Sequence, residues 1–151
     1  VQSFWELFYS QSLKCENILT MNSIFLLAGK TLCMRRLKHT DLQYSYYEVM
    51  SLLSEVDRTI LRSREIFDNL ENEYVYFVVE DLHTHMIIST CTVIITNART
   101  KLSQIACIEH IIIRKDYQNI GLGDIMFQRL KYYCLNTKRC LRLQINCNSE
   151  L

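Results

Sequence analysis

The sequence feature that most constrains the fold is a glycine loop set between a strand pattern and a helix pattern. Residues 116–124 read Asp-Tyr-Gln-Asn-Ile-Gly-Leu-Gly-Asp. Residues 108–114 before the loop, with three consecutive isoleucines, predict a buried strand. Apolar residues at helical spacing from 122 to 134 predict an amphipathic helix after it. This order gathers backbone N–H groups at a helix N-terminus, where a pyrophosphate can bind, and Gly121 and Gly123 let the backbone approach the anion.

A Gly-x-Gly pair alone is more often a simple turn, so its context matters. No Gly-Lys-Ser or Gly-Lys-Thr follows, which excludes a Walker A loop, and the spacing does not fit Gly-x-Gly-x-x-Gly. The chain has only three glycines and no proline, and two of the glycines lie in this loop. The strand and helix patterns on either side favour a ligand-binding loop.

Composition narrows the classes of protein that the chain can represent. The 151 residues, 49% of them hydrophobic, suit one main core. A net charge of +1 argues against a nucleic-acid partner, and no apolar run is long enough to span a membrane. Seven cysteines without a Cys-x-x-Cys pair predict a reducing compartment, and we expect the cytoplasm. His83 and His85 next to Asp81 are a weak metal pattern, because alternate hairpin residues face opposite sides, so we expect no metal.

The hydrophobic periodicity predicts an α/β (α+β) fold with a mixed sheet and helices on both faces. Residues 1–29 are interpreted as an N-terminal extension, either a docked helix or an interaction arm, and residues 30–151 as the main domain. Thr40 and Gln43 have the form of a capping box at the start of the first helix of that domain. The expected strands are 31–37, 74–80, 86–96, 104–114 and 141–147; a hairpin connection is expected at 81–85, and a second short helix at 64–70.

The order and spacing of these pieces resemble the GNAT acetyltransferase superfamily and, within it, the glucosamine 6-phosphate N-acetyltransferases. The resemblance covers residues 32–147. The segments that carry it are Met34-Arg35-Arg36-Leu37 followed by Asp41-Leu42, Val49-Met50-Ser51-Leu52-Leu53-Ser54-Glu55-Val56, Tyr76-Phe77-Val78-Val79-Glu80-Asp81, Ile108-Glu109-His110-Ile111-Ile112-Ile113, Tyr117-Gln118-Asn119-Ile120-Gly121-Leu122-Gly123 and residues 140–147.

The resemblance implies acetyl transfer from acetyl-CoA, as co-substrate, to the amino group of glucosamine 6-phosphate. It also implies a homodimer in the full-length protein. The implied cofactor-binding residues are Ile111, Ile112 and Ile113 on the strand and Gln118, Asn119, Ile120, Gly121, Leu122, Gly123 and Asp124 in the loop. Glu109 is the implied catalytic residue, which orients or deprotonates the amine. The implied acceptor-binding residues are Ser54, Arg99, Lys101, Glu109 and His110.

Alternatives remain open at several of these positions. Glu109 can instead be an ion-paired carboxylate, and Arg99 and Lys101 can be ordinary solvated loop residues. His110 stands where the family usually has aspartate; a core histidine that faces away from the site is the alternative we favour. The chain also stops at Leu151, before the family's tyrosine-bearing segment and closing strands, so we expect those strands to be missing and turnover by this chain to be poor.

Two other functions fit the same sequence. The first is a GNAT enzyme that acetylates another amine, on an amino acid or a protein. The second is a domain that binds acetyl-CoA without catalysis. The acceptor is the open question, because one fold and one cofactor site serve many acceptors.

Overall fold

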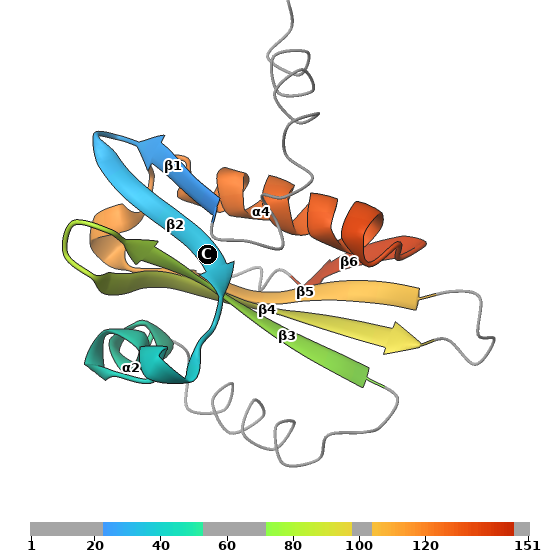
Figure 1. Cartoon of the computed structure of the whole chain (residues 1–151). Coiled ribbons are helices and arrows are strands. Elements are labelled where there is room, and N and C mark those ends of the chain that lie inside the picture. The colour runs from blue at the N-terminus through green and yellow to red at the C-terminus, as the bar shows by residue number, and fades with distance from the viewer. Residues whose placement is uncertain (1–22, 53–71, 98–103, 147–151) are drawn as a thin grey trace, which may run out of the picture.

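A single twisted sheet of six strands dominates the computed structural model, which describes residues 23–52, 72–97 and 104–146 (Figure 1). The strands lie in chain order across the sheet. They are β1 Ser23–Leu27, β2 Lys30–Arg36, β3 Asn72–Asp81, β4 Met86–Asn97, β5 Gln104–Ile113 and β6 Arg142–Asn146. All neighbours are antiparallel except β5 and β6, which are parallel, so the predicted mixed sheet is confirmed.

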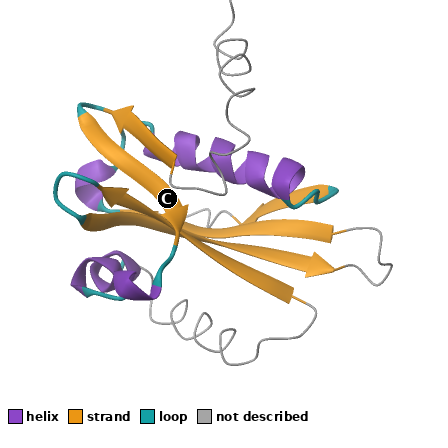
Figure 2. Cartoon of the chain, in the orientation of Figure 1, coloured by secondary structure: helices purple, strands orange, loops and turns teal. Residues whose placement is uncertain are grey.

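Helices cover both faces of the sheet, as predicted (Figure 2). The 3-10 turn η1, His39–Asp41, and helix α2, Tyr44–Met50, lie on one face. The turn η2, Lys115–Tyr117, and helix α4, Leu122–Tyr132, follow β5, and α4 crosses the other face. A π-helical turn, η3 Tyr133–Thr137, ends this crossover before β6. Among the described residues, no helix is long and apolar enough to cross a membrane.

The main core lies between the sheet and α4. Leu122, Met126 and Leu130 recur along one side of α4, and each is at most 1% exposed. Tyr133 continues this side and packs edge-to-face on Phe77 of β3, with ring centroids 5.1 Å apart. A smaller cluster on the opposite face joins Tyr46 of α2 to β3 and β4. The sheet therefore has two buried faces, which explains the nearly continuous apolar runs of its central strands.

The capping-box prediction was wrong in detail. Helix α2 begins after Gln43, and no side chain caps it. Instead, Asp41 accepts a hydrogen bond from the backbone N–H of Lys38 at 2.7 Å and receives the Arg35 guanidinium at 2.6 Å. A buried arginine from β2 therefore decides how the chain turns here. The expected helix at 64–70 lies outside the described residues.

Strand β1 was not predicted. Leu27 pairs with Lys30, and the two residues between them, Ala28 and Gly29, both have positive φ, as a tight hairpin turn requires. An Ala-Gly pair is a weaker turn signal than Asn-Gly, which is why the sequence did not reveal this hairpin. The sheet therefore continues across the boundary that we expected near residue 30. The extension before Ser23 lies outside the described residues.

Candidate functional site

Strand β5 carries an irregularity where the sequence predicts the site. Thr90 of β4 lies opposite Ile112, and Thr92 lies opposite Glu109, so one residue of β4 faces two residues of β5. The extra residue makes a β-bulge at positions 110 and 111, and His110 there has a φ of 54°. Histidine is among the residues that tolerate this left-handed conformation best, and bulges of this kind often adjoin active sites.

The bulged end of β5 has one edge outside the described sheet. The Ser89 hydroxyl donates to the Ile112 carbonyl at 2.6 Å, which shows that Ile112 directs its backbone groups toward β4. Because backbone groups alternate along a strand, those of Ile111 and Ile113 point to the opposite edge. Strand β6 pairs there only with Ile105–Glu109. An extended ligand can therefore add to this edge as a further strand.

The glycine loop leads from this edge into α4. Gly121 is the N-cap residue with a φ of 89°, and no side chain caps the helix. The first helical bond is donated by Ile125 to the Gly121 carbonyl, so the N–H groups of residues 122–124 lie outside the helical ladder. A Cβ at Gly121 would meet no atom of the described residues within 4 Å, whereas one at Gly123 would lie 3.5 Å from the Ile113 side chain. The start of the helix thus packs against β5, and no described residue fills the space in front of Gly121.

Gln118 has a structural contact in this loop. Its side-chain amide donates to the Ile113 carbonyl at 2.8 Å, on the open edge of β5. The loop and the strand edge are therefore joined directly. Of the other predicted loop residues, Asn119 and Ile120 follow Gln118, and Asp124 lies in the first turn of α4.

A buried hydrogen bond holds the turn before the loop in place. The Tyr117 hydroxyl donates to Asp81 at 2.6 Å, and both residues are buried. Burial favours the protonated acid, but the Tyr117 hydroxyl and the backbone N–H groups of His83 and Thr84 outweigh it, so the pKa of Asp81 is lowered. Burial and this bond raise the pKa of Tyr117 to about 12. Sequence reasoning missed the pair, because nothing local links residues 36 positions apart.

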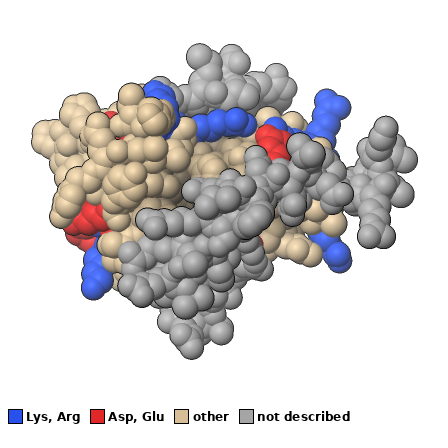
Figure 3. All heavy atoms as spheres, turned by 90° about the horizontal axis from the view of Figure 1, so that it is seen from below, with Lys and Arg blue, Asp and Glu red and all other residues tan. Residues whose placement is uncertain are grey.

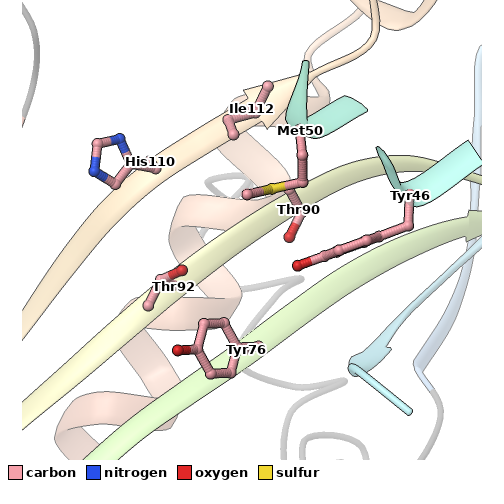
Figure 4. A pocket seen from close by; sticks show the side chains of 7 residues that line it. All are labelled: Tyr46, Met50, Tyr76, Thr90, Thr92, His110 and Ile112. Carbon is pink, nitrogen blue, oxygen red and sulfur yellow. The ribbon is translucent and has the colours of Figure 1, made fainter. Parts of the chain in front are cut away.

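A pocket lies between α2 and the sheet, on the face opposite α4. Figure 4 shows Tyr46 and Met50 reaching from α2 over β3 and β4. The lining residues share an open, partly polar surface; they are Tyr46, Met50, Tyr76, Thr90, Thr92, His110 and Ile112. None of the described lining residues is a lysine or an arginine.

Glu109 and His110 adjoin each other at this pocket. Glu109 is only 5% exposed and lies directly opposite Thr92, so its side chain is on the pocket face. Its Oε2 atom is 4.0 Å from Nε2 of His110, whose side chain is 21% exposed. The His110 ring lies at the β5 side of the pocket, away from Thr90 and Thr92 (Figure 4). This partly exposed position at the pocket is not that of a core histidine, contrary to the alternative we favoured.

The surface near the pocket carries both basic and acidic side chains. Arg114, at the end of β5, pairs with Glu48 of α2 at 3.5 Å and with Asp116 at 2.9 Å. Basic and acidic side chains are scattered over the described part of the face shown in Figure 3. Three predicted acceptor-binding residues, Ser54, Arg99 and Lys101, lie outside the described residues.

No protein-family model matches the sequence, and no curated protein matches it. Solved structures do match. One is glucosamine-6-phosphate N-acetyltransferase from Arabidopsis thaliana, with a TM-score of 0.61 and 21% identity over 80% of this chain and 85% of that chain.

Two further acetyltransferases resemble the chain to a similar degree. A GNAT family acetyltransferase from Staphylococcus aureus has a TM-score of 0.54 and 13% identity, over 78% of this chain and 87% of the other. The ribosomal-protein-alanine N-acetyltransferase of Brucella melitensis has a TM-score of 0.59 and 8% identity, over 79% and 81%. At such identities the similarity concerns the fold alone. The chain has the fold of the GNAT acetyltransferases.

Proposed function

We propose that this protein is an acetyl-CoA-dependent N-acetyltransferase of a small amine. The observation that carries the proposal is the meeting of three features: the bulge in β5, the open strand edge beyond it and the glycine-loop start of α4. The edge offers the backbone groups of Ile111 and the N–H of Ile113 to an extended amide chain such as pantetheine, while the Ile113 carbonyl accepts from Gln118. The N–H groups at 121–124 offer a site for a pyrophosphate.

Within the described residues the glycine loop can take the pyrophosphate of acetyl-CoA without rearrangement of a side chain, and on the strand edge the Gln118 amide already donates to the Ile113 carbonyl. The position in front of Gly121 is open within the described chain, and no side chain occupies the helix N-terminus as a cap. Gln118, Asn119, Ile120, Leu122, Gly123 and Asp124 complete the loop. Bound acetyl-CoA supplies an activated acyl group as its thioester. A backbone N–H at the bulge can stabilise the negative charge that develops on the acyl oxygen.

The acceptor amine enters from the α2 face. There Glu109 supplies a carboxylate beside the bulge, on the same face as the pocket. A carboxylate in this place can orient the amine and take part in its deprotonation. We propose glucosamine 6-phosphate as the acceptor, because of the motif resemblance and because one structural neighbour is described as an enzyme of that substrate. Arg99 and Lys101 are proposed to meet its phosphate.

One observation favours a second acceptor class. The described lining of the pocket contains tyrosine, threonine, methionine and histidine but no cationic side chain. A phosphate needs cationic or N–H partners, so this lining suits an amine without a phosphate.

The test is release of free CoA from acetyl-CoA with a panel of acceptors: glucosamine 6-phosphate, glucosamine, an aminoglycoside and a peptide with an N-terminal alanine. We expect glucosamine 6-phosphate to give the highest kcat/KM. If glucosamine is used equally well, the phosphate is not recognised and the second class is supported. A chain that does not bind acetyl-CoA in calorimetry contradicts the whole proposal.

A further inference from the structure

We propose that His110 is the proton-transfer residue of this site and that Glu109 acts through it, an inference that rests on the proposed acetyl transfer. The proposal starts from accessibility. The Glu109 side chain is 7% exposed, whereas the His110 side chain is 21% exposed and lines the pocket. An amine that enters from the α2 face therefore meets the imidazole before it meets the carboxylate.

The pair has the arrangement that activates an imidazole. Nε2 of His110 faces Oε2 of Glu109 at 4.0 Å. A carboxylate beside one ring nitrogen keeps the proton on that nitrogen, leaves the other nitrogen as the acceptor and stabilises the imidazolium that forms. Such contacts are often longer without substrate than with it. The polar residues that line the pocket with His110, among those the structure describes, are uncharged: Tyr46 of α2, Tyr76 of β3 and the threonines of β4.

The bulge places this imidazole between the two halves of the site. His110 belongs to the pocket, while the next residue, Ile111, directs its backbone to the open edge of β5. The acceptor nitrogen and the thioester must meet at this boundary. No other titratable side chain among the described residues both lines the pocket and lies in the bulge.

The proton transfers balance as follows. The bound ammonium first loses one proton to solvent. As the neutral nitrogen forms its bond to the acyl carbon, it loses a second proton to Nδ1 of His110. The carbon–sulfur bond then breaks, the electron pair stays on sulfur, and the imidazolium returns the proton to that thiolate. The products are an N-acetyl amide and CoA thiol, and His110 is regenerated.

The left-handed conformation of His110 suggests the variants. Glycine and asparagine also accept a φ of 54°, so His110→Gly and His110→Asn keep the bulge and remove the imidazole. We expect kcat for the accepted amine to fall at least about a hundredfold, as is typical for loss of a general base, with an unchanged Kd for acetyl-CoA. Added imidazole should restore much of kcat in His110→Gly, because the deleted ring leaves space for it.

His85 provides a matched control. It also has positive φ, at 57°, and its Nδ1 lies 3.5 Å from Glu80, but it is 79% exposed and is in the β3–β4 turn. His85→Gly should keep full kcat and should not respond to imidazole. Equal kcat in His110→Gly and the parent, or a loss that imidazole does not restore while acetyl-CoA still binds, would overturn the proposal.

A second measurement needs no acceptor. Diethyl pyrocarbonate modifies neutral imidazoles, and mass spectrometry of peptides follows each histidine separately. At pH 8, Glu109→Gln should slow modification of His110 severalfold, because it removes the carboxylate that keeps the proton on Nε2 and leaves Nδ1 as the reactive nitrogen. Modification of exposed His39 should be unchanged, because His39 does not pair with Glu109. An unchanged rate at His110 contradicts the pair whatever the acceptor is. A slowed rate in a protein that acetylates no amine on the panel supports the pair and contradicts the proposed function instead.

Discussion

At the scale of single residues, two glycines hold similar backbone conformations for different purposes. Gly29 turns the β1–β2 hairpin with a φ of 73°, and Gly121 begins α4 with a φ of 89°. Among the residues that the structure describes, a Cβ at either position meets no atom within 4 Å, so a substitution there is resisted by the backbone and not by crowding. The two sites therefore form a natural comparison between strain alone and strain beside a binding site.

Gly121→Ala and Gly29→Ala should each cost about 1 kcal/mol of stability, because left-handed φ disfavours a Cβ. Only Gly121→Ala should also weaken acetyl-CoA binding, since the added methyl group enters the open space in front of the loop. The measurements are urea unfolding and the ligand-induced rise in thermal midpoint. If both variants keep the parental ligand response, the glycine loop is not the pyrophosphate site.

The hydrogen bond from Tyr117 to Asp81 should contribute stability that depends on pH. Tyr117→Phe removes a buried bond to a charged group and should cost about 2 kcal/mol near neutral pH. Asp81 has a lowered pKa in the folded protein, so its contribution is present above about pH 4 and is lost as pH falls through the folded pKa. Urea unfolding across the acid range, with Asp81→Asn as the comparison, checks this: the variant should show a flatter acid limb.

At alkaline pH the stability contributed by this pair changes in the opposite direction, falling as pH rises. The pKa of Tyr117 is raised to about 12 in the folded protein, above the ordinary value of about 10, so its stabilising effect is full below pH 10 and is lost as pH rises toward 12. Tyr117→Phe should remove this alkaline loss. A parental slope in the variant would assign the alkaline dependence to other groups.

At the scale of elements, Arg35 joins three parts of the chain. From β2 it pairs with Asp41 of η1 at 2.6 Å and with Glu80 of β3 at 2.8 Å. Arg35 and Asp41 side chains are each only 8% exposed. Burial favours protonated Asp41, but the Arg35 guanidinium and the Lys38 N–H outweigh it and lower the pKa of this carboxyl. The connection from β2 to α2, and so the position of the pocket wall, depends on this buried ion pair.

Arg35→Met should destabilise the protein by about 3 kcal/mol, because it leaves a buried carboxylate without its cation. Lys138→Met is the control. Lys138 pairs with Glu73 at 2.7 Å, but that pair is more exposed and should contribute less than about 1 kcal/mol. Urea unfolding of both variants measures the two losses of stability. Similar losses would show that burial does not make the ion pairs of Arg35 contribute more than the exposed pair of Lys138.

At the scale of the whole molecule, the described cysteines belong to the packed interior. Cys33, Cys91, Cys134 and Cys140 are buried, Cys107 is partly buried, and none of these five forms a disulfide. Burial raises the pKa of Cys91, and it raises that of Cys134 to about 12. These thiols pack as small apolar side chains and are poor nucleophiles.

Iodoacetamide at pH 8 should therefore modify Cys91 and Cys134 only as fast as the native protein unfolds, and Cys107 sooner. In urea all three should react at similar rates. Peptide mass spectrometry over time measures each site. Rapid modification of Cys134 in the native protein would mean that the packing between η3 and the sheet opens readily.

Local patterns in the sequence were sufficient to predict the central strands, the glycine loop and α4, because strand alternation, helical spacing and glycine placement act over a few residues. The loop was a candidate binding site from its own local pattern, whereas Glu109 was a candidate because of the resemblance to the GNAT acetyltransferases. Only the tertiary structure decided the bulge that places His110 at the β5 side of the pocket, the Tyr117–Asp81 bond, the Arg35–Asp41 pair and the pairing of β1. Each of these depends on partners brought together by sheet register or by burial, and neither can be read from neighbours in the chain.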